Sequence, residues 1–160
     1  MDRGLFVSRT EAESTTLNTL IDRYVAEIVP TKRGARTDRS RAKTLKLHFG
    51  ADKLAALSSS QIAKFRDDRL AEVGPQTIVH ELNLLNRVLK TATMDWGIAL
   101  PSGLPTANVR KSSKPPGRNL RVSSQEIEAI VTTSESQQLG VIARLTVETA
   151  LRRSEIAGLT

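Results

Sequence analysis

The sequence has no cysteine, which excludes disulfide bonds and thiolate chemistry. Its two histidines, His48 and His80, are far apart in the chain, so no metal-ligand cluster is expected. Only five of the 160 residues are aromatic, and we expect leucine, isoleucine, valine and alanine to fill the core. No apolar run approaches the roughly 20 residues that a membrane-spanning helix needs, and the N-terminus has no apolar signal core. We therefore expect a cytoplasmic protein without a membrane, cofactor, metal or small-molecule partner.

Acidic residues are almost absent from two stretches of an already basic chain, whose formal net charge is +7. Residues 31–49 hold seven positive charges against the single Asp38, and residues 97–122 hold five positive charges and no acid. A basic balance of this kind indicates a polyanionic partner, most often nucleic acid. The alternative for 31–49 is a solvated helix face, although such faces usually mix both signs of charge.

The spacing of apolar residues predicts an all-α fold. A first helix from Leu17 ends at Pro30, and Tyr24 lies on its inward stripe. A second helix ends at Gly50, and a capping box from Ser58 to Gln61 starts a third. Residues 1–16 are expected to form an N-terminal arm, or simply a frayed terminus.

The clearest predicted helix follows Pro75 and has two stripes. One is apolar, recurring at steps of three and four residues from Ile78 to Trp96, and should face the core. The other is polar without an acid, and its amide and guanidinium groups are side chains able to contact base edges or phosphates. An ordinary exposed face is the alternative, above all for His80. The polar stripe comprises Gln76, His80, Asn83, Arg87 and Lys90.

Prolines, glycines and serines mark residues 101–122 as a linker between two domains. A merely flexible linker needs no positive charge, whereas a linker that crosses a phosphate backbone gains affinity from it. The whole set of candidate DNA-binding residues is Arg36, Arg39, Lys43, Lys46, Gln76, His80, Asn83, Arg87, Lys90, Arg110, Lys111, Lys114, Arg118 and Arg121.

Beyond the linker, a capping box from Ser123 to Glu126 opens further short helices, and the chain finishes on an arginine-containing segment from Thr149 to Leu159. This segment resembles the motif that carries the first catalytic arginine of the tyrosine recombinases, or phage-type integrases. Shorter pieces resemble the same family in the same order along the chain: Thr77–Val79, Ala92–Gly97 and Asn119–Ser123.

The resemblance implies a fold class and a domain plan. Residues 17–100 would be a four-helix, SAM-like core-binding domain that binds DNA, and 123–160 the first helices of a truncated α+β catalytic domain. In the motif Arg152 matches the catalytic arginine that holds the scissile phosphate, and Glu155 matches an acidic position that orients it. Ala150 departs from the usual glycine. The adjacent Arg153 is the other arginine of this segment, and the spacing to Ser154 and Glu155 favours Arg152 as the catalytic one and Arg153 as the one that faces solvent. The alternative for Arg152 and Glu155 is an ordinary ion pair at the start of a helix.

We therefore expect the DNA-binding part of a site-specific tyrosine recombinase, acting in DNA integration and recombination. The family's nucleophilic tyrosine has no counterpart, because Tyr24 is the only tyrosine. This chain should bind double-stranded DNA without cleaving it, as a truncation or fragment. The parent would form a tetramer on two DNA sites, and this chain would be monomeric off DNA. The alternatives are a non-catalytic DNA-binding regulator derived from an integrase and a helical protein-interaction adaptor.

Overall fold

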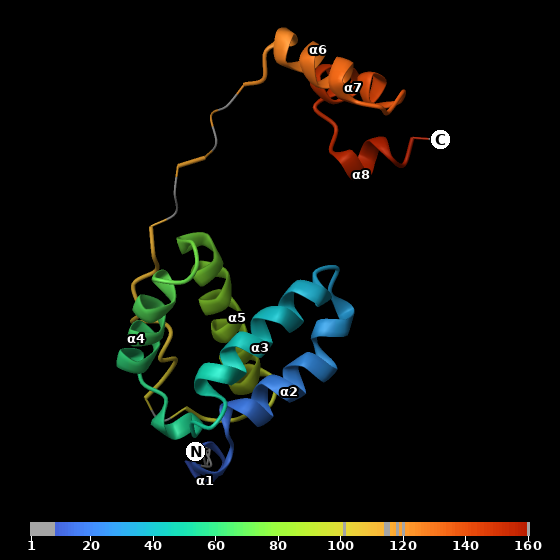
Figure 1. The fold of residues 1–160 in the computed structure, drawn as a ribbon. Coiled ribbons are helices and arrows are strands. Elements are labelled where there is room, and N and C mark those ends of the chain that lie inside the picture. The colour runs from blue at the N-terminus through green and yellow to red at the C-terminus, as the bar shows by residue number, and fades with distance from the viewer. Residues whose placement is uncertain (1–8, 101, 114–115, 118, 120, 160) are drawn as a thin grey trace, which may run out of the picture. The chain divides into compact units, whose positions relative to one another are not determined.

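The computed structural model describes residues 9–100, 102–113, 116–117, 119 and 121–159. Within these ranges the chain is helical and has no strand, which confirms the predicted all-α fold. Residues 1–115 and 116–160 form two separate compact units (Figure 1). The α-helices of the first unit are α1 (Arg9–Ser14), α2 (Leu17–Glu27), α3 (Ala35–Phe49), α4 (Ser59–Leu70) and α5 (Pro75–Met94).

The long helix α5 lies at the centre of the first unit and packs against α2, α3 and α4. Its predicted apolar stripe is confirmed from Ile78 to Ala92, and Trp96 is half-buried at its end. A second row on α5, which includes Leu84 and Val88, is buried as well. The central position of α5 therefore follows from apolar residues on two of its sides. The sequence analysis identified only the side that runs from Ile78 to Trp96.

The ends of the helices follow the local signals of the sequence. Thr16 accepts a hydrogen bond from the backbone N–H of Thr19 at the start of α2, and Ser58 and Gln61 form a complete capping box at the start of α4. Tyr24 is buried in the core as predicted. Helical spacing in α4 predicts that Leu70 faces the core together with Ile62 and Phe65. The prediction is wrong for Leu70, which is 41% exposed in the last turn of the helix.

The second unit consists of α6 (Ser124–Thr133), α7 (Leu139–Thr149) and α8 (Arg153–Ile156). Helices α6 and α7 contact each other, as do α7 and α8. Most apolar residues of α6 and α7 nevertheless remain exposed, including Ile130 at 56% and Val141 at 61%. Apolar spacing in the last segment predicts that Ile156 and Leu159 both face inward. Ile156 of α8 is buried, whereas Leu159, beyond the end of α8, is 62% exposed, so the prediction is wrong for Leu159.

The start of α6 gives a prediction about pH. The N–H and hydroxyl groups of Ser123 donate hydrogen bonds to the Glu126 carboxylate, at 2.7 and 2.9 Å, and lower the pKa of that carboxyl below its ordinary value of 4.5. A lowered folded-state pKa stabilises the folded state above the ordinary pKa, and the gain disappears as the pH falls through the lowered value. We expect acid to fray α6 in the natural chain, and Glu126→Gln to remove this part of the pH dependence. Amide hydrogen exchange of residues 124–133 between pH 3 and 6 measures it; equal pH profiles for the two proteins would contradict the prediction.

Candidate nucleic-acid interface

Helix α3 has one buried and one cationic face, and both follow from residue spacing. Ala42, Leu45 and Phe49 are buried against the rest of the bundle. The predicted residues Arg36, Arg39 and Lys43 are exposed, and in the described part of the chain none of them forms an ion pair. Their charges are therefore available to a partner.

Lys46, the fourth predicted cation of α3, has a different environment. Its Nζ lies 2.6 Å from Oδ1 of Asp22 on α2, so this lysine is neutralised within the bundle. The Asp22 side chain is 58% exposed, however, which leaves the pair accessible to solvent. A solvent-exposed pair of this kind is weak, at about 0–1 kcal/mol, and a competing phosphate could replace the carboxylate.

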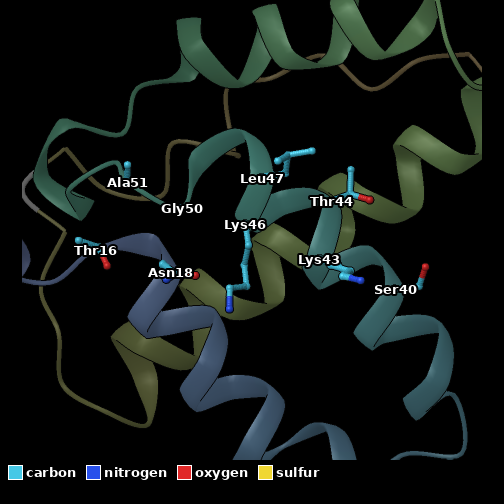
Figure 2. A pocket seen from close by; sticks show the side chains of 9 residues that line it. All are labelled: Thr16, Asn18, Ser40, Lys43, Thr44, Lys46, Leu47, Gly50 and Ala51. Atoms are coloured by element: carbon cyan, nitrogen blue, oxygen red, sulfur yellow. The ribbon is translucent and has the colours of Figure 1, made fainter.

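An open pocket lies between the outer face of α3 and the N-terminal end of α2 (Figure 2). Leu47 projects beside it with 84% of its side chain exposed, although a leucine normally favours burial. Sequence reasoning missed this surface, yet Ser40, Lys43 and Leu47 recur at steps of three and four residues opposite the apolar stripe. The lining residues are Thr16, Asn18, Ser40, Lys43, Thr44, Lys46, Leu47, Gly50 and Ala51.

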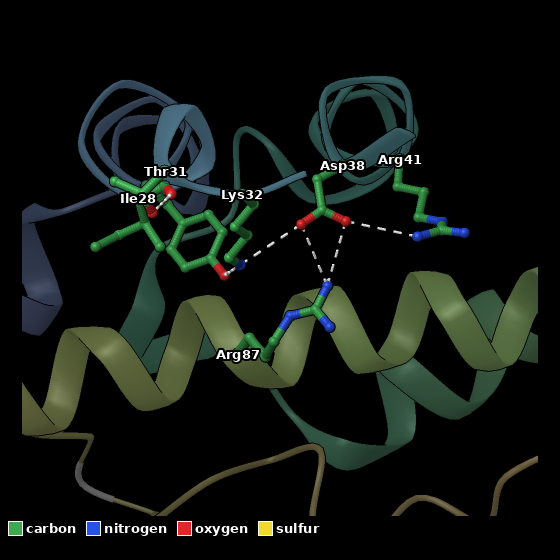
Figure 3. Close-up of polar contacts among 7 residues, drawn as sticks. Ile28, Thr31, Lys32, Asp38, Arg41 and Arg87 are labelled. Atoms are coloured by element: carbon green, nitrogen blue, oxygen red, sulfur yellow. Dashed lines mark hydrogen bonds and ion pairs between the residues drawn. The ribbon is translucent and has the colours of Figure 1, made fainter. Parts of the chain in front are cut away.

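The polar stripe of α5 is divided between different environments. Gln76 and His80 share a hydrogen bond of 2.8 Å between their side chains, and Asn83 is half-buried. Arg87 extends toward Asp38 of α3, and its Nη2 donates to both carboxylate oxygens at 3.3 and 3.4 Å (Figure 3). Lys90 is exposed near α4. The stripe is thus polar as predicted, but its members have different partners.

Part of the predicted linker belongs to the first unit and packs along α4. Val109 belongs to the buried core, and Ser59 of α4 donates a 2.7 Å hydrogen bond to the carbonyl of Pro105. Arg66 of α4 holds the carbonyl of Arg110 at 2.7 Å. These contacts fix the first half of the linker along α4, a result that its composition did not indicate.

The linker cations are accordingly found in different places. Arg110 and Arg121 are exposed, whereas Lys114 and Arg118 lie outside the described residues. Lys111 lines the same cavity as Lys90 of α5, so the structure brings together two candidates from separate parts of the sequence.

A buried ion pair links α4 to α5 and was not predicted. The guanidinium of Arg69 donates to both carboxylate oxygens of Glu81, at 2.9 and 3.3 Å, and also contacts the exposed Glu72. The Glu81 side chain is only 3% exposed. The hydrogen bonds that Arg69 donates to the Glu81 carboxylate are the main reason why the pKa of Arg69 is raised. The pair holds the two helices together and offers no free charge to a partner.

In the second unit the structure brings Arg152 and Glu155 together. The carboxylate of Glu155 accepts a 2.7 Å hydrogen bond from the backbone N–H of Arg152 and lies 3.4 Å from its Nη1. The Arg152 side chain is 84% exposed. Glu155 thereby positions both the backbone and the guanidinium of Arg152, while the planar fork of the arginine remains open to solvent.

Ala150, two residues before Arg152, has a strained backbone conformation. Ala150 has a φ of 53° and is the one non-glycine residue with positive φ in the part of the chain described here. An L-residue in this conformation costs about 1–2 kcal/mol, and glycine would remove that strain. Glycine is also more flexible in the unfolded chain, which offsets part of the gain. We expect Ala150→Gly to stabilise the second unit by about 0.5–1 kcal/mol. Slower amide exchange in α7 checks this, with the β-branched Ala150→Val as the opposite control; faster exchange in the glycine variant would contradict it.

The two units therefore define a class of protein: an all-α chain with a cationic bundle, followed by a short helical unit that carries an arginine–glutamate segment. No family model matches the chain, and no solved structure matches it. Over 94% of its own length, the chain is 32% identical to a protein of Haemophilus influenzae that is named as an integrase/recombinase. Over 91% of its length it is 28% identical to a second protein of that name from the same organism. It is also 28% identical to the shufflon-specific DNA recombinase of Escherichia coli, over 90% of its length.

These similarities, at 28–32% identity over about 90% of the chain, support a place in the tyrosine recombinase (integrase) family. The chain spans about half the length of the curated relatives it matches, namely 44%, 50% and 40% of them. The described residues include no helix long and apolar enough to cross a membrane.

Proposed function

We propose that this chain is the DNA-binding part of a site-specific tyrosine recombinase that acts in DNA integration and recombination. The observation that carries the proposal is the outer face of α3, where Arg36, Arg39 and Lys43 are exposed and unpaired among the described residues. Keeping several like charges close together is unfavourable unless an anionic partner offsets them. The recombinase names of the relatives support DNA as that partner, and we take it to be double-stranded.

Affinity would come mainly from phosphate contacts and the release of counterions. In this proposal α3 and the polar stripe of α5 approach adjacent major grooves. Arg110, Lys111 and Arg121 contact the phosphate backbone between the grooves. The half-buried Asn83 is the candidate for a base contact, because an amide can pair with both hydrogen-bonding groups of adenine.

Arg152 would contact the scissile phosphate in the longer protein. Its guanidinium is planar and permanently charged, so it can donate to two phosphate oxygens at once and offset charge in a pentacoordinate transition state. Glu155 would keep that fork oriented. The longer protein would assemble as a tetramer on two DNA sites, and the present chain would be monomeric off DNA.

Cleavage is not expected from this chain by itself. Family members attack DNA with a tyrosine, and the only tyrosine here is Tyr24, which is 2% exposed in the core. We expect a nicked suicide duplex carrying the recombination site to be bound without forming a covalent protein–DNA adduct. Denaturing electrophoresis after incubation measures this, and a longer product with its tyrosine is the positive control. An adduct formed by the present chain would contradict the proposal.

A second candidate function is a helical adaptor that binds protein, and the exposed apolar side chains of α6 and α7 favour it. Such binding would be insensitive to salt, whereas phosphate contacts are weakened steeply by it. A DNA-binding regulator that occupies sites without cutting them shares every feature of the main proposal except catalysis. Complementation with a separately supplied catalytic half would distinguish it.

A further inference from the structure

Asp38 is a buried acid in the most basic helix of the chain, and three cations from three elements converge on it (Figure 3). Lys32, which follows α2, places Nζ 3.5 Å from the carboxylate, and Arg41 of α3 places Nη1 at the same distance. Arg87 of α5 donates from Nη2 to both oxygens. The Asp38 side chain is only 9% exposed, so its orientation is fixed by these neighbours.

The cluster has more positive charge than its own stability requires. Three positive charges face one negative charge, which leaves an excess of two. One cation would neutralise the carboxylate, and each additional one repels the others at short range. The excess is also accessible, because 46% of the Arg87 side chain and 30% of the Lys32 side chain are exposed. Binding of an anion from solution or from a partner would therefore stabilise this cluster of three cations around Asp38.

We propose that Asp38 is a positioning residue of the DNA-binding surface, which holds Lys32, Arg41 and Arg87 as a preformed site for one DNA phosphate. This inference rests on the proposed function. In the described part of the chain, Arg87 has no hydrogen-bond acceptor other than Asp38, so its Nε and Nη1 donors are available. Holding the guanidinium in place before DNA arrives reduces the entropy lost on binding.

The geometry assigns Arg87 to phosphate rather than to a base edge, where the sequence pattern had also allowed it. Reading guanine requires two parallel donors of the arginine fork, and Nη2 is already occupied by both oxygens of Asp38. The remaining donors, with the ammonium of Lys32 nearby, suit the several acceptor oxygens of a phosphate.

The substitution Asp38→Asn tests the proposal, because a positioning role and simple electrostatics predict opposite changes in DNA affinity. Asp38→Asn removes a negative charge at almost constant size, so simple electrostatics predicts tighter DNA binding. The positioning role predicts weaker binding, by roughly three- to tenfold at 0.1 M salt, because about one phosphate contact loses its geometry. The matched control is Asp68→Asn, which removes the same charge from an exposed site on α4. Fluorescence anisotropy with a 30-base-pair duplex of mixed sequence measures both, after circular dichroism has confirmed the fold.

Further variants distinguish a wrong inference about this phosphate site from a wrong proposed function. Arg87→Gln should reduce the slope of log affinity against log salt by about 0.9, and the slope should change much less in a protein that already carries Asp38→Asn. Arg144→Gln, at a 69% exposed arginine of the second unit, is the control. If Asp38→Asn does not fold, Arg87→Gln decides alone: an unchanged slope overturns the inference. Asp38→Asn binding as tightly as Asp68→Asn also overturns it, whereas failure of the natural chain to bind any duplex overturns the proposed function itself.

Discussion

Replacing Arg36, Arg39 and Lys43 together with alanine is expected to weaken DNA binding by about two orders of magnitude at 0.1 M salt, with little effect on the fold. Each phosphate contact contributes roughly 0.9 to the slope of log affinity against log salt, so the loss of three should reduce the slope by about 2.7. The effect should be similar for all DNA sequences, because phosphate contacts carry no direct sequence information.

The matched control for this prediction replaces Lys53, Lys64 and Arg144 with alanine, which removes the same number of charges from exposed positions elsewhere. Anisotropy titrations at several salt concentrations compare the two triple variants. A control that weakens binding as much as the α3 variant would show that only net charge matters. An α3 variant with unchanged slope would show that this helix does not contact DNA.

The second large effect is expected at the buried pair between α4 and α5. Glu81→Ala leaves Arg69 without its main partner while 13% of the Arg69 side chain is exposed. Breaking a buried pair by removing one member typically costs about 3–5 kcal/mol, which is a large part of the stability of a small domain. We expect a loss of at least about 3 kcal/mol, measured by urea unfolding followed at 222 nm.

Glu72→Gln is the control for that loss, because it removes the other acid that contacts Arg69. The Glu72 side chain is 60% exposed, and exposed pairs contribute only about 0–1 kcal/mol. Equal destabilisation by the two variants would mean that the burial of Glu81 has no special role. The double substitution Arg69→Met with Glu81→Leu should restore much of the stability, because the buried charges are replaced as a pair.

Local signals predicted most of the helices, because caps and apolar spacing act over a few residues. The capping boxes at Ser58 and Ser123 are both present, and the apolar stripe of α5 is buried. The same spacing contained one further signal that was not used. Asp38 precedes Ala42, Leu45 and Phe49 at a step of four, so the acid lies on the buried stripe of α3.

Contacts between distant segments could not be predicted in the same way. Glu81 looks like any surface acid until Arg69 is brought beside it by the packing of α4 on α5. The linker composition indicates a flexible segment, yet Val109 is buried and Arg66 binds the carbonyl of Arg110. For the candidate interface, the sequence indicated which residues of α3 are cationic. Only the structure shows that Lys46 is paired with Asp22 while Lys43 is not.

The central claim is that the exposed cations of the first unit bind the phosphates of double-stranded DNA. The most direct test is the affinity of the natural chain for a mixed-sequence duplex at 50 and 200 mM salt. If four or more phosphates are contacted, affinity should fall by at least about a hundredfold between the two concentrations. The absence of binding at 50 mM salt, or an affinity that does not change with salt, would contradict the claim.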